Sequence, residues 1–318
     1  RGILFGTLAN ERQLVRGQHG NGGAQMQGPM ERHFTESLQL FALDAETGEQ
    51  KWIHIAKESI RNNSIAIGNG RVYLIDRPVA TIDLWLRTDV AKAIKEGKEV
   101  PDHPLGTLIC LDAATGREVW SNDTDIFGTT LALSKKHDLL VMSYNTVGRT
   151  VPSDSKPRQA RCYHAATGKE AWTQKGMGFR PILSDDIIYS YPRAPDLFTG
   201  KPRPLRRDAA SNEQGCATRV QGKGIGCGTP IGSRNMLFIR SGTVGYYDIE
   251  NDSGWLDTYG SIRSGCWINA IPVGGIVLVP DDTRACRCSF PNQASIALYQ
   301  RGIRPPMVRP VAEQKNWQ

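Results

Sequence analysis

The side chains best suited to chemistry are arginines and short polar residues that lie between the apolar, strand-forming stretches of this sequence. Guanidinium groups bind carboxylates through forked hydrogen bonds, and amide or acid side chains can complete such a site. We therefore expect an anion-binding set of Arg61, Asn63, Asp125, Arg180, Arg263, Trp267 and Asn269. The alternative is that these residues end strands and pair with one another, because structural ion pairs are common.

Metal and nucleophile chemistry has weaker support in the sequence. The six histidines show no i, i+4 pair and no metal-ligand spacing, so no metal site is predicted. His19 and His33 share one polar, Gly-rich segment, where a catalytic or ligand role is an open alternative. No Ser-His-Asp arrangement can be argued from the sequence alone.

The elements that must position these residues come from an internal repeat. The stretch from Leu40 to Trp52 recurs at 109–120 and 162–172, and each copy has a Thr-Gly pair four residues before a Trp. A fourth trace at 196–201 keeps the turn. The pattern predicts strand, turn, strand, in which glycine takes a positive φ. One unit cannot bury its Trp alone, so we expect each Trp to pack against a neighbouring unit.

The segments between the repeats read as β-hairpins, for example at 64–75 and 130–142, and an insertion at 83–99 could form a short helix. A hairpin followed by strand-turn-strand gives four antiparallel strands. The sequence therefore predicts an all-β fold, a β-propeller with about six four-stranded blades, which could be part of a seven- or eight-bladed ring. We expect one domain over residues 1–302 and a C-terminal tail over 303–318.

The first blade lacks an obvious opening strand. Either the tail closes the ring, or blades upstream of Arg1 have been lost. The long insertions at 9–36, 77–105 and 144–158 all connect the second and third strands of a blade, so they open on one face of the propeller. The proposed anion-binding set lies on the same face, at the mouth of the central channel.

Charge and hydropathy argue against two classes of partner. The net charge is +7, but the Lys and Arg residues are scattered and form no basic stripe, so nucleic acid is not expected. The longest apolar stretch, 267–280, is too short to span a membrane. No signal peptide is visible, and because the chain starts at Arg1, we expect a processed or truncated piece.

The Ala-Leu-Asp-x-x-Thr-Gly-x-x-x-Trp units resemble the repeats of pyrroloquinoline-quinone-type (quinoprotein-like) propellers. The segments around Cys227, Cys266 and Cys286 look like a variant found in uncharacterised secreted bacterial members. That family includes periplasmic quinone-dependent alcohol dehydrogenases and cofactor-free scaffolds of the outer membrane. The dehydrogenases have two adjacent cysteines above the quinone, whereas Arg287 separates Cys286 from Cys288 here.

The resemblance implies a periplasmic or secreted bacterial protein. We expect a binding or scaffold propeller of the cell envelope, which takes a protein partner or an anionic ligand at the loop-rich face. One alternative is a dehydrogenase that holds pyrroloquinoline quinone with calcium. Another is a carbohydrate-active enzyme that acts on acidic polysaccharide. Fold alone does not decide among these functions.

The chain has seven cysteines, so at least one thiol is unpaired unless it bonds to another chain. Cys110 and Cys162 occupy the same position in successive repeats and are expected to be small buried residues. The oxidising compartment implied by the resemblance favours disulfides among Cys216, Cys227, Cys266, Cys286 and Cys288. A zinc or copper thiolate site is the alternative, although Cys-x-Cys is not the usual zinc spacing.

Overall fold

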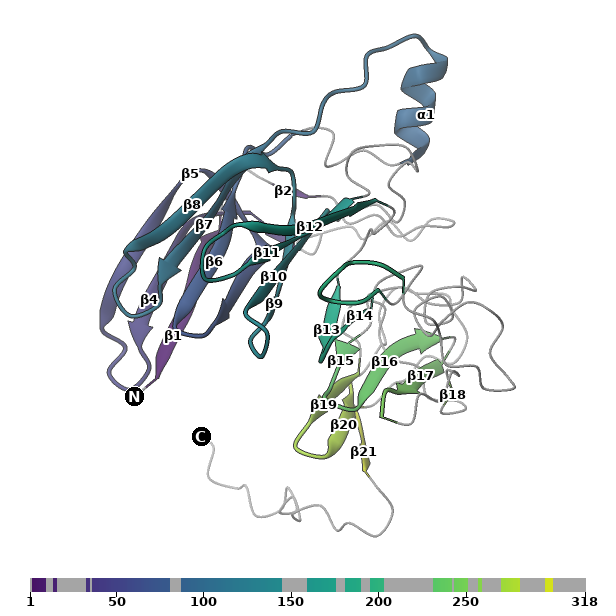
Figure 1. Cartoon of the computed structure of the whole chain (residues 1–318). Helices are drawn as coiled ribbons and strands as arrows, with labels where there is room; N and C mark the ends of the chain where they lie inside the picture. The colour runs from purple at the N-terminus through teal and green to yellow at the C-terminus, as the bar shows by residue number, and fades with distance from the viewer. Residues whose placement is uncertain are drawn as a thin grey trace, which may run out of the picture. The chain divides into compact units, whose positions relative to one another are not determined.

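The fold of the chain is taken from a computed structural model (Figure 1). It describes residues 2–9, 14–15, 33–34, 36–80, 87–144, 159–175, 181–189, 195–202, 231–241, 243–250, 257–258, 270–280 and 295–299. The contacts divide the chain into two compact units, the first made of Arg1–Leu205 and Asn212–Thr218 and the second of the remaining residues. Whether residues 1–302 form one domain therefore stays a prediction.

Antiparallel strands make up nearly all of the described secondary structure. In the first unit they are β1 (Ile3–Ala9), β2 (Leu14–Val15), β3 (His33–Phe34), β4 (Glu36–Asp44), β5 (Gln50–Gly68), β6 (Arg71–Asp76), β7 (Gly106–Asp112), β8 (Glu118–Ile126), β9 (Thr130–Ser134), β10 (Leu139–Ser143), β11 (Gln159–His164), β12 (Glu170–Lys175), β13 (Ile182–Ser184) and β14 (Ile187–Tyr189). The all-β prediction is confirmed, and the repeats form propeller blades.

In the second and third blades the repeat supplies the third and fourth strands, and the hairpin before it supplies the first two. In the first blade, β4 and the start of β5 have only β1 beside them among the described residues. The third blade is the sheet β9-β10-β11-β12. The second blade is formed by the end of β5 with β6, β7 and β8, inside a six-stranded sheet that also contains β1 and β4 (Figure 1). The first and second blades share one sheet because β5 is continuous. The sequence suggested two strands there, but an irregularity between Ile60 and Ile65 lets one strand pass from blade to blade.

Successive blades pack through the predicted tryptophans. Trp52, on β5, packs with Leu74, Ile109 and Leu111 of the second blade in one buried cluster. Its indole Nε1 donates a hydrogen bond to the carbonyl of Ala113 at 3.0 Å. The same bond recurs from Trp120 to Ala165 at 3.1 Å and from Trp172 to Leu197 at 2.9 Å. Each Trp thus packs against the following unit, as predicted, and Trp52 and Trp172 are buried while Trp120 is partly buried.

The repeat turns are built by an acid and a glycine. The carboxylate of Asp112 accepts hydrogen bonds from the backbone amides of Ala114 at 3.1 Å and Thr115 at 2.8 Å. Gly116 follows with a φ of 71° and donates its amide hydrogen to the Asp112 carbonyl at 2.8 Å. In the third repeat, the backbone carbonyl of His164 still accepts from Gly168 at 2.8 Å, so the turn forms without the acid.

The second unit has the same kind of antiparallel sheet. One sheet contains β15 (Ile231–Gly232), β16 (Met236–Ser241), β17 (Thr243–Asp248) and β18 (Asp257–Thr258). Another contains β19 (Ile271–Val273), β20 (Ile276–Val279) and β21 (Ile296–Tyr299). Phe238, Val244 and Val279 lie in the shared core of these two sheets.

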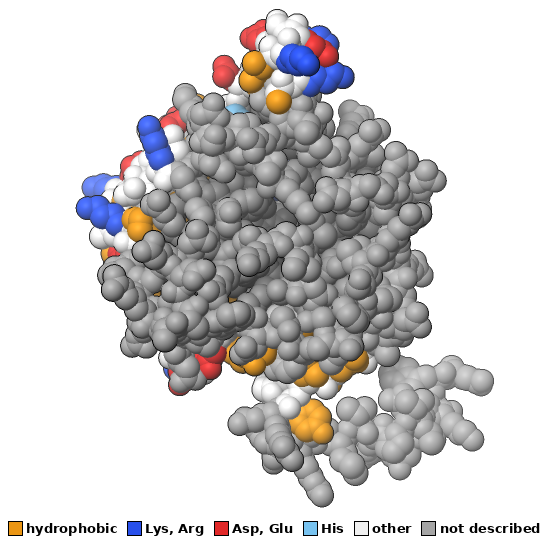
Figure 2. All heavy atoms as spheres, turned by 90° about the vertical axis from the view of Figure 1, so that its right-hand side faces the viewer, with side chains coloured by type: hydrophobic (Ala, Val, Ile, Leu, Met, Phe, Trp, Pro, Cys, Tyr) orange, Lys and Arg blue, Asp and Glu red, His pale blue; other side chains and the backbone are white. Residues whose placement is uncertain are grey.

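The insertion between β6 and β7 contains the predicted short helix, α1 (Arg87–Lys95). Figure 2 shows basic and acidic side chains together over this region, at the top of the molecule. Lys92 and Lys98 form ion pairs with Glu96, and Ile94 is largely exposed. Because most of its surface is polar or charged, this helix contributes little to the blade cores. No helix among the described residues is long and apolar enough to cross a membrane.

Candidate functional site

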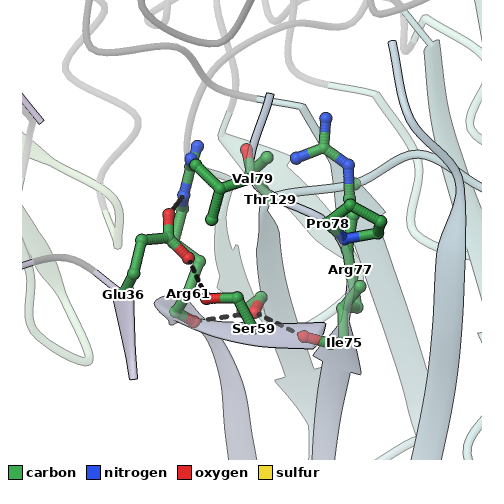
Figure 3. Close-up of a pocket in the computed structure, with 10 residues that line it drawn as sticks. Glu36, Ser59, Arg61, Ile75, Arg77, Pro78, Val79 and Thr129 are labelled. Carbon is green, nitrogen blue, oxygen red and sulfur yellow. Dashed lines mark hydrogen bonds and ion pairs between the residues drawn. The ribbon is translucent and has the colours of Figure 1, made fainter. Parts of the chain in front are cut away.

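A polar pocket lies at the end of the first and second blades from which the long insertions leave (Figure 3). The hollow comprises about 200 Å³ of space between atoms, a figure that includes open solvent. The residues around it come from β4, β5 and β6 and from the segments that follow β6 and β8. Its lining is formed by Glu36, Ser59, Arg61, Ser64, Ile75, Arg77, Pro78, Val79, Gly128 and Thr129.

The centre of the pocket is a buried ion pair between Arg61 and Glu36. The Nε of Arg61 lies 2.5 Å from Oε1 of Glu36, and the two side chains are 9% and 3% exposed. The other carboxylate oxygen, Oε2, accepts a hydrogen bond from Ser59 Oγ at 2.9 Å. Both oxygens of Glu36 are thus used, and the guanidinium group is fixed in one orientation. A buried charged pair needs such hydrogen-bond partners, because its atoms no longer contact water.

The floor of the pocket is held by backbone contacts. Ser64 Oγ donates to the Arg61 carbonyl at 2.7 Å and lies 3.5 Å from the Ile75 carbonyl. Asp76 accepts backbone amide hydrogens from Lys57, Glu58 and Ser59 at 2.6–3.0 Å. These bonds satisfy the β5 backbone just before the irregularity between Ile60 and Ile65, where pairing with β6 is interrupted. The bend that forms the pocket is therefore stabilised at both ends.

Arg77 supplies the second guanidinium group. It is 6% exposed, its Nε donates to the Pro104 carbonyl at 2.8 Å, and its charged carbon lies 5.8 Å from the ring centre of Tyr144. Through these contacts Arg77, at the start of the insertion 77–105, is linked to the end of that insertion at Pro104. It is also linked to the start of the insertion 144–158 at Tyr144. Figure 3 shows the Arg61 and Arg77 guanidinium groups on opposite sides of the pocket, both directed toward the same end, with Thr129 between them.

The charge of this pocket favours an anion. Two guanidinium groups and one carboxylate belong to its lining, which leaves one positive charge in excess. Because both arginines are held by protein groups, they offer donors in a fixed arrangement and need little reordering to bind a carboxylate. The arrangement can bind and orient an acidic group.

The structure brings together only part of the predicted anion-binding set. Arg61 lines the pocket, and Asn63 lies close to it in sequence with its side chain exposed. Asp125 does not line this pocket: it forms an ion pair with Arg161 of the next blade. Arg180, Arg263, Trp267 and Asn269 lie outside the described residues. The alternative of strand-end pairing therefore applies to Asp125 and in part to Arg61.

The Asp125 contact joins the second and third blades. Arg161, on β11, binds Asp125 and also lies 3.3 Å from Glu170. Its guanidinium carbon lies 5.7 Å from the ring centre of Phe127. Asp125 has a φ of 54°, a backbone conformation that aspartate tolerates better than most residues. Its ion pair with Arg161 identifies it as a residue of the blade interface.

The sequence did not predict four residues of the pocket, namely Glu36, Ser59, Arg77 and Thr129. Glu36 is the last residue of the insertion at 9–36, and Arg77 is the first of the insertion at 77–105. Charged residues at the boundary between a strand and a long insertion were therefore the signal that could have identified them. Ser59 and Thr129 have no such signal, because their roles depend on the continuous β5 and on the approach of the next blade.

The described cysteines are buried and unpaired. Cys110 and Cys162 lie inside the blade cores, as expected. Burial raises the pKa of Cys110 to about 11 and that of Cys162 to about 12. Burial also raises the pKa of Tyr163 to about 12, against the opposing effect of the Arg161 charge. The five disulfide candidates, Cys216, Cys227, Cys266, Cys286 and Cys288, lie outside the described residues.

A calcium-quinone site needs a group of acidic or other ligands close together. Within the described ranges, no group of three or more His, Cys, Asp or Glu side chains is placed to hold a metal ion.

Comparison with known proteins agrees with the repeat. Residues 103–176, which contain the second and third repeats, match the PQQ-repeat family described as outer membrane protein assembly factor BamB. The resemblance predicted from the repeat motifs is thus confirmed over that segment. No curated protein matches the chain.

Two solved structures are similar to the chain at low identity. The crystal structure of BamB from Moraxella catarrhalis is 14% identical, with 80% of this chain and 70% of that chain covered and a TM-score of 0.44. The computationally designed Ika8 protein is also 14% identical, with 82% and 77% covered and a TM-score of 0.38.

Proposed function

Because residues 103–176 contain quinoprotein-like repeats of the BamB type, we propose that this chain is a binding or scaffold propeller of the bacterial cell envelope. It binds its partner at the loop-rich face, through an acidic group on that partner. The observation on which this rests is the pocket of Arg61 and Arg77, two buried guanidinium groups at the point where the long insertions leave the blades.

The partner class follows from the form of the pocket. A buried, oriented guanidinium group favours a planar carboxylate, because two parallel N–H groups can bind its two oxygens. The pocket is narrow inside and open to solvent at its mouth, so it suits contact with one acidic side chain or one chain terminus at that mouth better than it suits a large cofactor. The partner is therefore a protein with an exposed acidic segment, and the surrounding insertions supply the wider contact area. A periplasmic or secreted location agrees with the name of the matched family.

The test measures binding of a fluorescent, Glu-rich peptide to the full chain. Arg77→Gln removes a charge from the pocket and keeps a polar side chain of similar length. A hydrogen bond to a charged group contributes about 1.5–3 kcal/mol, so affinity should fall by about tenfold or more. Arg71→Gln is the matched control, since Arg71 lies at the opposite end of β6 and pairs with Asp138. Its affinity should stay close to that of the unchanged protein.

An equal loss in the two variants would mean that the peptide binds by net charge alone and would remove the pocket from the proposal. Circular dichroism of both variants shows whether the blades remain folded. A Gln-rich peptide of the same length should not bind. Quinone with calcium and an acidic polysaccharide are added in parallel. A quinone absorbance change or an unsaturated sugar product would favour the corresponding enzymatic alternative instead.

A further inference from the structure

The residue two places after each repeat tryptophan lies between two successive blades. The third and fourth strands of the blades pair in the same register around it, so His54, Asn122 and Gln174 occupy equivalent positions. Because side chains alternate along a strand, each of the three lies on the same face of its blade as the tryptophan before it. That face packs against the following blade.

In the second and third blades this residue makes a hydrogen bond to the next blade. Asn122 Nδ2 donates to the carbonyl of Gly168 at 3.0 Å, and Gln174 Nε2 donates to the carbonyl of Thr199 at 3.3 Å. Both acceptors belong to the Thr-Gly turn of the following repeat. A side-chain amide does not titrate, so these two contacts do not depend on pH.

The first blade lacks this hydrogen bond. His54 Nε2 is shielded from solvent, and it has no hydrogen-bond partner among the described residues. A neutral imidazole leaves one nitrogen without a hydrogen, whereas the charged form has an N–H on both nitrogens. Protonation of His54 therefore places a charge and a donor at a buried atom that has no acceptor, which is unfavourable.

The charges around His54 do not remove this penalty. The carboxylates of Asp76, on β6, and Glu118, on β8, act on it from the second blade, and the facing turn carries the oppositely charged Asp112 and Arg117. The charged residues of its own strand are Lys51, Lys57, Glu58 and Arg61. Burial lowers the pKa of His54 below its ordinary value, although Asp76 and Glu118 act in the opposite direction.

The two carboxylates already have partners. Asp76 accepts three backbone amide hydrogens of β5, and Glu118 Oε1 accepts from Ser121 Oγ at 2.7 Å. Neither carboxylate forms a hydrogen bond with His54 Nε2. The interface between the first and second blades thus contains a titratable group at the position where the next two interfaces have a neutral amide.

We propose that His54 makes the contact between the first and second blades sensitive to acid, whereas the contact between the second and third blades is not. The closed interface favours neutral His54, so its stability is complete above the ordinary histidine pKa near 6.5. This stability is lost as the pH falls toward the lower pKa of the closed state.

The test follows the indole N–H groups of the full chain by hydrogen exchange in NMR, with ¹⁵N-labelled tryptophan. Trp52 Nε1 is bonded to Ala113 across the His54 interface, and Trp120 Nε1 is bonded to Ala165 across the Asn122 interface. Between pH 7.5 and pH 5.5, the protection of Trp52 relative to free indole should fall, while that of Trp120 should stay constant. An equal change of both, or no change at Trp52, would overturn the proposal.

His54→Asn supplies the amide found at position 122 and removes the titration. At pH 5.5 its Trp52 should be about two- to tenfold better protected than in the unchanged protein, the factor expected for one net hydrogen bond. His54→Gln repeats the measurement with the side chain of position 174. His164→Asn is the control, because His164 is exposed, and it should keep the acid dependence of Trp52. The same acid dependence in His54→Asn and His54→Gln would refute the role of His54.

Discussion

The indole of Trp52 lies directly on Gly116 of the next blade, so close that a Cβ at Gly116 would be 2.7 Å from the ring. The Thr-Gly-x-x-x-Trp motif thus encodes two different interfaces. The glycine of one unit contacts the indole of the preceding unit, and the tryptophan of that same unit packs against the glycine of the following unit. This explains why the glycine and the tryptophan recur together in each repeat.

Gly116→Ala should therefore destabilise the protein more than an ordinary change at a turn. The left-handed conformation costs a non-glycine residue about 1–2 kcal/mol, and forcing the indole aside adds about 1–3 kcal/mol. Gly70→Ala has only the conformational cost, because nothing lies within 4 Å of its Cβ position. Urea unfolding of both variants measures the difference, and equal losses would show that the indole moves freely.

Glu36→Gln should be strongly destabilising, because it removes the carboxylate that pairs with the buried Arg61 charge. Removing one member of a buried pair costs about 3–5 kcal/mol. The exposed pair Lys136–Asp185, with side chains 68% and 71% exposed, serves as control. Asp185→Asn should cost less than about 1 kcal/mol.

The double variant Glu36→Gln, Arg61→Gln tests the same pair further. It should recover part of the loss, since no uncompensated charge then remains. If the double variant is as unstable as the sum of the two single variants, the pair does not act as a unit.

The sequence predicted the elements that depend on local pattern. The repeat turn follows from Asp112, Thr115 and Gly116, and the buried position of Cys110 follows from strand alternation. The pocket could not be predicted in the same way, because it depends on β5 crossing between two blades without a break. Arg61 lines the pocket, but its partner Glu36 is 25 residues away in sequence. Pairing across such a separation is set by strand register, which no local pattern specifies.

The thiols of Cys110 and Cys162 should resist alkylation in the folded protein. Their pKa values are raised to about 11 and about 12, so almost no thiolate exists at pH 8, and burial also blocks access. Iodoacetamide followed by peptide mass spectrometry should label them only after unfolding. Rapid labelling of either peptide at pH 8 in native buffer would contradict their place in the core.

The same raised pKa values predict alkaline destabilisation. A thiol whose pKa is higher in the folded state than in the unfolded chain favours folding below the unfolded pKa, near 8.5. That contribution is lost as the pH rises through the folded values of about 11 and 12. The free energy of unfolding should therefore fall above about pH 9, and Cys162→Ala should reduce the slope. An unchanged slope would mean that other groups control this range.

Asp112→Asn should weaken the dependence of stability on acid pH. Hydrogen bonds from the Thr115 side chain and backbone, and from the Ala114 backbone, lower the pKa of Asp112 below its ordinary value. A carboxylate with a lowered pKa stabilises the fold above the unfolded pKa, near 3.9, and this contribution disappears as the pH falls through the folded pKa.

Asparagine keeps an acceptor oxygen for the turn but does not titrate, so the variant should lose less stability than the unchanged protein between pH 5 and pH 3. The pKa of Asp44 is also lowered, first by hydrogen bonds from the backbone amides of Glu46 and Thr47. Asp44→Asn should act in the same direction, and the double variant should lose the least stability between pH 5 and pH 3. Urea midpoints at the two pH values measure the effect. An equal fall of the urea midpoint between pH 5 and pH 3 in all four proteins would show that the repeat turns do not contribute to acid unfolding.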